Sequence, residues 1–140
     1  MFINDTQKDW GKGIPPYEDT DLMTDAELYD FALDVVAGYE SEHGAKLIDA
    51  SPQRQSYPSI ICQIDGELSF ILVEASVAPK NPVLSENRKN ILLNHARKFN
   101  AKCYYAPVCF GACDADRFNK SLALKGDAFY VNYEGLEEIN

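Results

Sequence analysis

The sequence predicts a single α/β domain in which a mixed central sheet has helices on both faces. Residues 57–75 form two strand-like runs on either side of Asp65-Gly66, as in a β-hairpin. An amphipathic stretch at residues 86–99 then separates the second of these runs from a further strand-like run, and a helix in this place joins parallel strands through a crossover. The chain has 140 residues, 46% of them hydrophobic, which is enough to build one core of this kind.

The domain is expected to cover residues 24–140. Residues 1–23 are rich in glycine, proline and acidic residues and have no periodicity, so they predict an irregular N-terminal arm. No run approaches the roughly 18 apolar residues that a membrane span needs. The start of the sequence also lacks the apolar segment of a secretory signal. We therefore expect a cytoplasmic protein that does not bind a membrane.

The first element is predicted to be a helix that begins at a capping box. Thr24 and Glu27 have the spacing at which each side chain accepts a hydrogen bond from the other residue's backbone N–H. Apolar residues then recur every three or four positions, and Gly44 is a natural end for the helix. Asp30 and Asp34 make the outer face of this helix acidic.

Three strand candidates follow the helix, at Ala45–Ala50, Tyr57–Ile64 and Glu67–Ala75. Asp-Gly between two of them indicates a type I′ turn, which needs positive φ at both central positions. If Ile64 pairs with Glu67, then Ser59 lies opposite Leu72. Ser59 and Glu74 become diagonal neighbours about 7–8 Å apart. The third strand is apolar on both faces, which is typical of an interior strand.

The second half of the chain completes the predicted order α-β-β-β-α-β-α-β. Ser85 is the expected N-cap of the crossover helix. The remaining elements are the crossover helix at Glu86–Phe99, a strand at Ala101–Cys109 parallel to the third, a short helix at Asp114–Leu124 and a last strand at Ala128–Tyr133.

The distribution of charge bears on the partner. The net charge of −9 disfavours indiscriminate binding to nucleic acid, which depends on Lys and Arg, and it favours a protein partner. Between Lys80 and Lys102, however, there are six basic residues and one acid. These form either a solvated helix surface or a nucleic-acid contact, which would use Arg88, Lys89, Arg97 and Lys98.

The candidate site is a group of polar residues at the far end of the hairpin. Ser59, Glu74 and Ser76 are expected on one face of the sheet. A carboxylate at the end of an interior strand is costly to bury unless it is paired, hydrogen-bonded or bound to a metal. In the simplest alternative, Glu74 has only a structural role, with hydrogen bonds to Tyr57, Ser59 or Ser76.

The element order from Thr24 to Cys109 resembles the restriction-endonuclease-like fold of the PD-(D/E)xK superfamily. In that family an aspartate after a proline and an acid-x-lysine motif hold a divalent metal, which activates water. Pro58-Ser59 and Glu74-Ala75-Ser76 stand at these positions, so only the glutamate is kept. The resemblance therefore implies a degenerate member of the superfamily.

Serine is a weak ligand for Mg²⁺, which carboxylates usually hold. We therefore expect a non-catalytic binding or accessory module without a cofactor. The alternative is an active nuclease that uses Mg²⁺ or Mn²⁺ at Glu74. It would need a relocated lysine, Lys80 or Lys89, and a second metal ligand, for which Glu27 is the candidate. A third alternative is an acidic protein-interaction domain.

Overall fold

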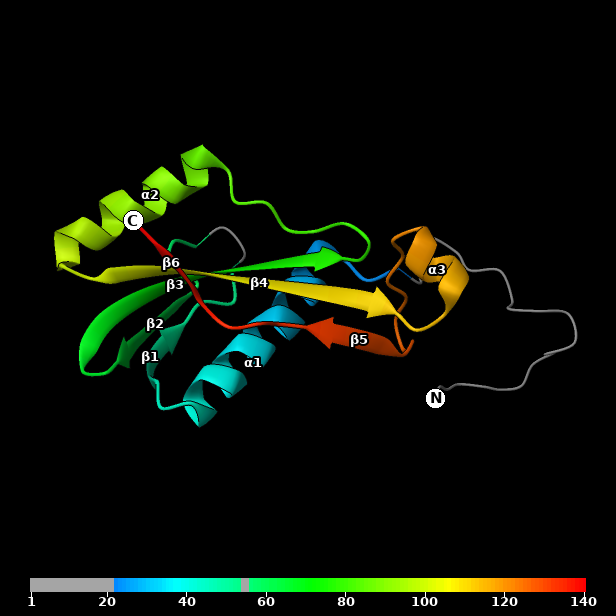
Figure 1. Ribbon diagram of the computed structural model, residues 1–140, viewed down its shortest axis with the longest axis horizontal. Helices are drawn as coiled ribbons and strands as arrows, with labels where there is room; N and C mark the ends of the chain where they lie inside the picture. Colours follow the sequence, from blue (N-terminus) through cyan, green and yellow to red (C-terminus); the bar gives the residue numbers. More distant parts are fainter. Residues whose placement is uncertain (1–21, 54–55) are drawn as a thin grey trace, which may run out of the picture.

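The computed structural model describes residues 22–53 and 56–140, which form three helices and a six-stranded mixed sheet (Figure 1). The strands lie in the order β1-β2-β3-β4-β5, and β6 pairs with another part of β4. This architecture confirms the predicted combination of a mixed sheet with helices. In chain order the elements are α1 (Asp25–Glu42), β1 (Lys46–Ala50), β2 (Ile60–Ile64), β3 (Glu67–Val77), α2 (Glu86–Phe99), β4 (Lys102–Ala112), α3 (Ala115–Asn119), β5 (Phe129–Asn132) and β6 (Glu137–Ile139).

Helices cover both faces of the sheet, as expected. On one face, Tyr29 of α1 packs in a cluster that includes Ile71 of β3. On the other face, Leu92 of α2 packs with Leu72, the next residue of β3. Consecutive strand residues point to opposite faces, and both Ile71 and Leu72 are completely buried. The prediction that β3 is an interior strand is therefore confirmed.

The hairpin has the predicted turn and register. Asp65 and Gly66 have φ values of 53° and 79°, the positive values that a type I′ turn requires. Ile64 pairs with Glu67, and the register continues unbroken to Ile60 opposite Ile71. The capping box of α1 is also present, with Thr24 and Glu27 bonded to each other's backbone N–H.

The crossover through α2 makes β3 and β4 parallel, from Ser69 opposite Lys102 to Val77 opposite Phe110. Parallel strands end at the same edge of a sheet, and ligands of open α/β sheets bind beyond such carboxyl ends. Here one pocket is lined by residues from the starts of α1 and α2 and from the end of β3. The first turns of both helices therefore lie beside the end of β3.

The structure departs from the predictions in the third helix and in the strands near the end of the chain. The short third helix ends at Asn119 rather than at Leu124, because Ser121 adopts a left-handed backbone with φ of 56°. The last predicted strand is present as β5, and a further strand, β6, follows it. Every residue of β1 is exposed, as suits a strand at the edge of the sheet.

The N-terminal arm predicted at residues 1–23 lies almost wholly outside the described residues. Its last two residues contact the domain: Leu22 forms a bridge with Leu124, and the N–H of Met23 donates to the carbonyl of Ala123 at 2.8 Å. Across residues 22–53 and 56–140, no helix is long and apolar enough to span a membrane.

Candidate functional site

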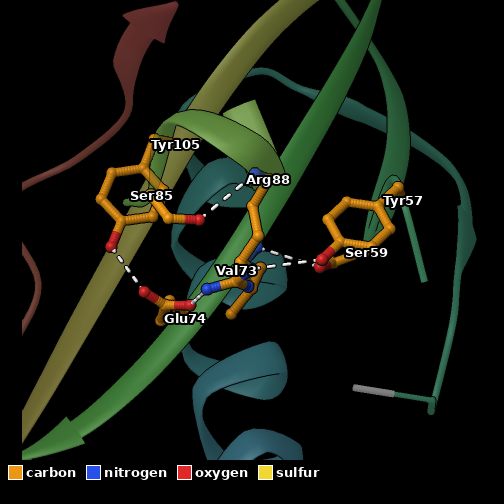
Figure 2. Close-up of polar contacts among 7 residues, drawn as sticks. All are labelled: Tyr57, Ser59, Val73, Glu74, Ser85, Arg88 and Tyr105. Atoms are coloured by element: carbon orange, nitrogen blue, oxygen red, sulfur yellow. Dashed lines mark hydrogen bonds and ion pairs between the residues drawn. The ribbon is translucent and has the colours of Figure 1, made fainter. Parts of the chain in front are cut away.

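Glu74 lies near the end of β3 on the face covered by α2, and protein groups bind both of its carboxylate oxygens (Figure 2). The hydroxyl of Tyr105 donates to Oε1 at 3.0 Å. The guanidinium of Arg88 donates through Nη1 to Oε2 and forms an ion pair with it. Only 17% of the Glu74 side chain is exposed, and 29% of that of Arg88. The cost of burying the carboxylate is therefore offset by an ion pair and a hydrogen bond.

The local sequence explains how Arg88 reaches this carboxylate. Ser85 is the N-cap of α2, and its hydroxyl accepts a hydrogen bond from the N–H of Arg88 at 3.2 Å. This cap fixes the first turn of the helix above the end of β3. The Nε of Arg88 also donates to the hydroxyl of Tyr57 at 3.2 Å, so the guanidinium bridges Tyr57 and Glu74.

Tyr105 completes the group from the neighbouring strand β4. Burial raises the pKa of its hydroxyl to about 12, although Arg88 partly opposes this rise. Tyr105 therefore stays protonated at neutral pH and can keep donating its hydrogen bond to Glu74. Neither Tyr105 nor Arg88 belongs to the set of partners expected for Glu74, namely Tyr57, Ser59 and Ser76.

The predicted grouping of Ser59 with Glu74 is wrong. The N–H of Ser59 donates to the carbonyl of Ile71, which already pairs with Ile60. Ser59 and Ile60 thus both lie opposite Ile71, as in a β-bulge. The bulge moves Ser59 out of the register that the hairpin turn sets. Its hydroxyl accepts from the N–H of Val73 at 3.0 Å and bonds with Tyr29 of α1. Ser59 therefore lies with the α1 core, away from the α2 side where Glu74 is held.

This placement predicts that an aspartate at position 59, where the PD-(D/E)xK motif has one, will not create a metal site. Ser59 is 1% exposed, so Ser59→Asp buries a carboxylate beside Tyr29, and we expect a loss of at least about 2 kcal/mol of unfolding free energy. Ser76→Asp, at a partly exposed position, is the matched control and should cost less than about 1 kcal/mol. Urea denaturation measures both. A stable Ser59→Asp protein that gains Mn²⁺ affinity would contradict the placement of Ser59.

Ser76 and Lys80 lie together at the turn that follows β3. The hydroxyl of Ser76 donates to the carbonyl of Lys80 at 3.1 Å, and the thiol of Cys109 is 3.5 Å from the same oxygen. These contacts hold the turn so that Lys80 lines the same pocket as Glu74. Within the described part of the chain, the Lys80 ammonium has no ion-pair partner.

Two predicted site residues lie elsewhere. Lys89 lines a different pocket, together with Glu137 of β6. Glu27 is occupied by the capping box, and its carboxylate lies 4.0 Å from the ammonium of Lys125. Glu27 is therefore not among the residues that line the Glu74 pocket, although other residues at the start of α1 line it. Asp25, two residues earlier in α1, lines the Glu74 pocket instead.

The basic residues of α2 differ in their surroundings. Arg88 points inward to Glu74, and Arg97 donates to the side chain of Asn94 at 3.0 Å. Lys98 is exposed, whereas Lys89 is half-buried. Of the four residues expected to contact nucleic acid, one is thus engaged in the interior ion pair.

The pocket at the end of β3 has a volume of about 540 Å³. Its charged lining residues are two acids and two bases, namely Asp25, Glu74, Lys80 and Arg88. The positive and negative charges of the lining therefore cancel. Among residues 22–53 and 56–140, no group of three or more His, Cys, Asp or Glu side chains could hold a metal ion. The pocket can offer hydrogen-bond donors and a cation to a ligand.

Residues 26–139, most of the chain, match the family profile of a domain of unknown function, DUF8840. No curated protein and no solved structure matches the chain.

Proposed function

Since the chain belongs to the DUF8840 family, a domain of unknown function, we propose a function from the residues of its own site. The protein is a nuclease-like domain without catalytic activity that serves as a binding or accessory module. The observation that carries the proposal is that Arg88 and Tyr105 bind both oxygens of the Glu74 carboxylate. Kinship with the PD-(D/E)xK superfamily is part of the proposal. It is supported by the three-strand meander and the crossover helix.

The charges around Glu74 oppose metal binding. A Mg²⁺ or Mn²⁺ ion would have to displace the Arg88 guanidinium, and it would then lie close to two positive groups, Arg88 and Lys80. Mg²⁺ also needs several oxygen ligands in near-octahedral geometry. In the proposed module, Arg88 supplies the positive charge that a metal ion supplies in an active nuclease.

The proposal is tested by measuring metal binding and cleavage with the full chain. We expect no heat of binding for Mn²⁺ in calorimetry up to about 1 mM, and no cleavage of plasmid or single-stranded DNA with Mg²⁺ or Mn²⁺. Micromolar Mn²⁺ affinity that disappears in Glu74→Ala would contradict the proposal. Ser76→Ala is a matched control, because it changes the same pocket without touching the Glu74 carboxylate.

A second candidate function is an active divalent-metal nuclease. It is favoured by the pocket itself, which brings an acid from α1, Asp25, together with Glu74 and Lys80. In this case Lys80 is the relocated lysine, and the Arg88 side chain turns toward the substrate phosphate when the metal binds. Cleavage with Mn²⁺ that is lost in both Glu74→Ala and Lys80→Ala is the required result. Inactivity on several nucleic-acid substrates would remove this candidate.

A further inference from the structure

The outer edge of β5 is open and lacks the features that usually protect an edge strand. β5 pairs with β4 on one side, and no described residue pairs with its other side. The strand Phe129–Asn132 contains no charge, no proline and no bulge. By contrast β1, at the opposite edge, carries Lys46 and Asp49 and a register shift between Leu47 and Asp49. Charges and bulges are devices that block further strand pairing, and β5 has none of them.

The ladder between β4 and β5 determines which backbone groups face outward. The N–H of Cys113 donates to the carbonyl of Ala128 at 3.1 Å, in the same register as the rest of the ladder. Hydrogen-bonded and non-hydrogen-bonded pairs alternate along antiparallel strands. Tyr130 and Asn132 therefore bond to β4, whereas the N–H and C=O groups of Phe129 and Val131 point away from the sheet.

An apolar patch lies beside these outward-facing groups. Val131 pairs with Phe110, so both side chains lie on the α1 face, where the Phe31 ring meets the Phe110 ring at 6.5 Å between centroids. Phe31 is 56% exposed and Val131 is 51% exposed. An open strand edge next to exposed apolar side chains is the surface that an added β-strand covers.

The charge next to this patch is negative. Asp34 is exposed on α1 three positions after Phe31, so the two side chains are neighbours on the helix surface, and Asp34 has no ion-pair partner within the described ranges. The chain as a whole carries a net charge of −9. A segment that covers the patch thus gains from a basic residue near an apolar one.

We propose that the outer edge of β5 binds an extended basic segment of a partner protein as an added strand. The partner's backbone bonds to the outward N–H and C=O groups of Phe129 and Val131. Its central apolar side chain covers Phe31 and Val131, and a flanking lysine or arginine approaches Asp34. This proposal goes beyond the proposed function and does not depend on Glu74.

The experiment uses two labelled peptides and measures fluorescence anisotropy at low ionic strength. In the peptide TKTVTKT both lysines and the valine lie on one face of an extended strand, and TETVTET is its acidic counterpart. We expect the basic peptide to bind the full chain at least about tenfold more tightly than the acidic one. Asp34→Asn should reduce this difference.

Two variants separate strand pairing from general attraction to a negative protein. Val131→Pro removes an outward N–H and leaves the bonds to β4 in place, since proline is tolerated at such positions of edge strands. It should weaken basic-peptide binding at least about tenfold, whereas the matched control Val131→Thr keeps the N–H and should stay within about threefold of the wild type. If circular dichroism shows that Val131→Pro is unfolded, the uncharged variant Phe31→Ser replaces it and should give the same loss.

Three outcomes would overturn the proposal. The first is equal binding of both peptides, or no binding of the basic peptide up to about 1 mM. The second is binding of the basic peptide that neither Val131→Pro nor Phe31→Ser weakens, since this means general electrostatic attraction. The third is a concentration-dependent dimer that Val131→Pro abolishes, because the occupant of the edge would then be a second copy of the chain.

Discussion

Ile71→Ala is expected to lower the free energy of unfolding by about 3 kcal/mol, because it opens a cavity in the core under α1. Ile71 is completely buried at the centre of β3, where it packs with Tyr29 and Ile60. The loss has two parts, the removed apolar surface and the incomplete closure of the cavity. Equilibrium denaturation in urea measures it as a shift of the midpoint.

The matched control is the same substitution at the edge of the sheet. Ile48 of β1 is 55% exposed, so Ile48→Ala should change the unfolding free energy by less than about 0.5 kcal/mol. Equal effects of Ile71→Ala and Ile48→Ala would mean that β3 is not the buried centre of the domain.

Arg88→Met is expected to cost about 2 kcal/mol, because it leaves the Glu74 carboxylate with only the hydrogen bond from Tyr105. Methionine keeps most of the length of the arginine side chain, so the change isolates the loss of the guanidinium. Glu74→Gln should also destabilise the protein, since it leaves the Arg88 guanidinium without the negative charge of its ion pair.

A double-mutant cycle separates the interaction energy between Arg88 and Glu74 from the effects of each substitution on other contacts. In the double variant of Arg88→Met and Glu74→Gln no unpaired charge is left behind, so its loss should be smaller than the sum of the single losses by about 1 kcal/mol or more. Additive losses would contradict the ion pair. Ser85→Ala is a useful comparison, because it removes the helix cap and leaves the guanidinium and the carboxylate intact.

Local chemistry made the hairpin and the first helix predictable. Asp65-Gly66 fixes the turn through the backbone angles that it permits, and the turn then sets the register as far as Ile60. Thr24 and Glu27 define the start of α1 in the same way, because a capping box is formed between residues three positions apart.

The part of the hairpin beyond Ile60 could not be predicted in this way. The bulge at Ser59 depends on contacts with Val73 and Tyr29, which are distant in the sequence, and it reverses the face on which Ser59 lies. A register counted from the turn assumes regular pairing, and a single extra residue invalidates it.

The partners of Glu74 were missed for a related reason. Tyr105 lies 31 residues away and Arg88 lies 14 residues away, so only the crossover through α2 brings them together. One signal in the sequence could have indicated Arg88: it is the third residue after the N-cap Ser85, so it belongs to the first helical turn, next to the end of β3.

The most direct test of whether Glu74 is a structural ion-pair residue is a crystal of the full chain soaked in about 10 mM MnCl₂, a concentration that fills weak metal sites. Anomalous diffraction then locates bound Mn²⁺. We predict no anomalous peak within bonding distance of the Glu74 carboxylate, with the Arg88 guanidinium and the Tyr105 hydroxyl still on its two oxygens. A Mn²⁺ ion bound to Glu74, with Arg88 displaced, would contradict the account.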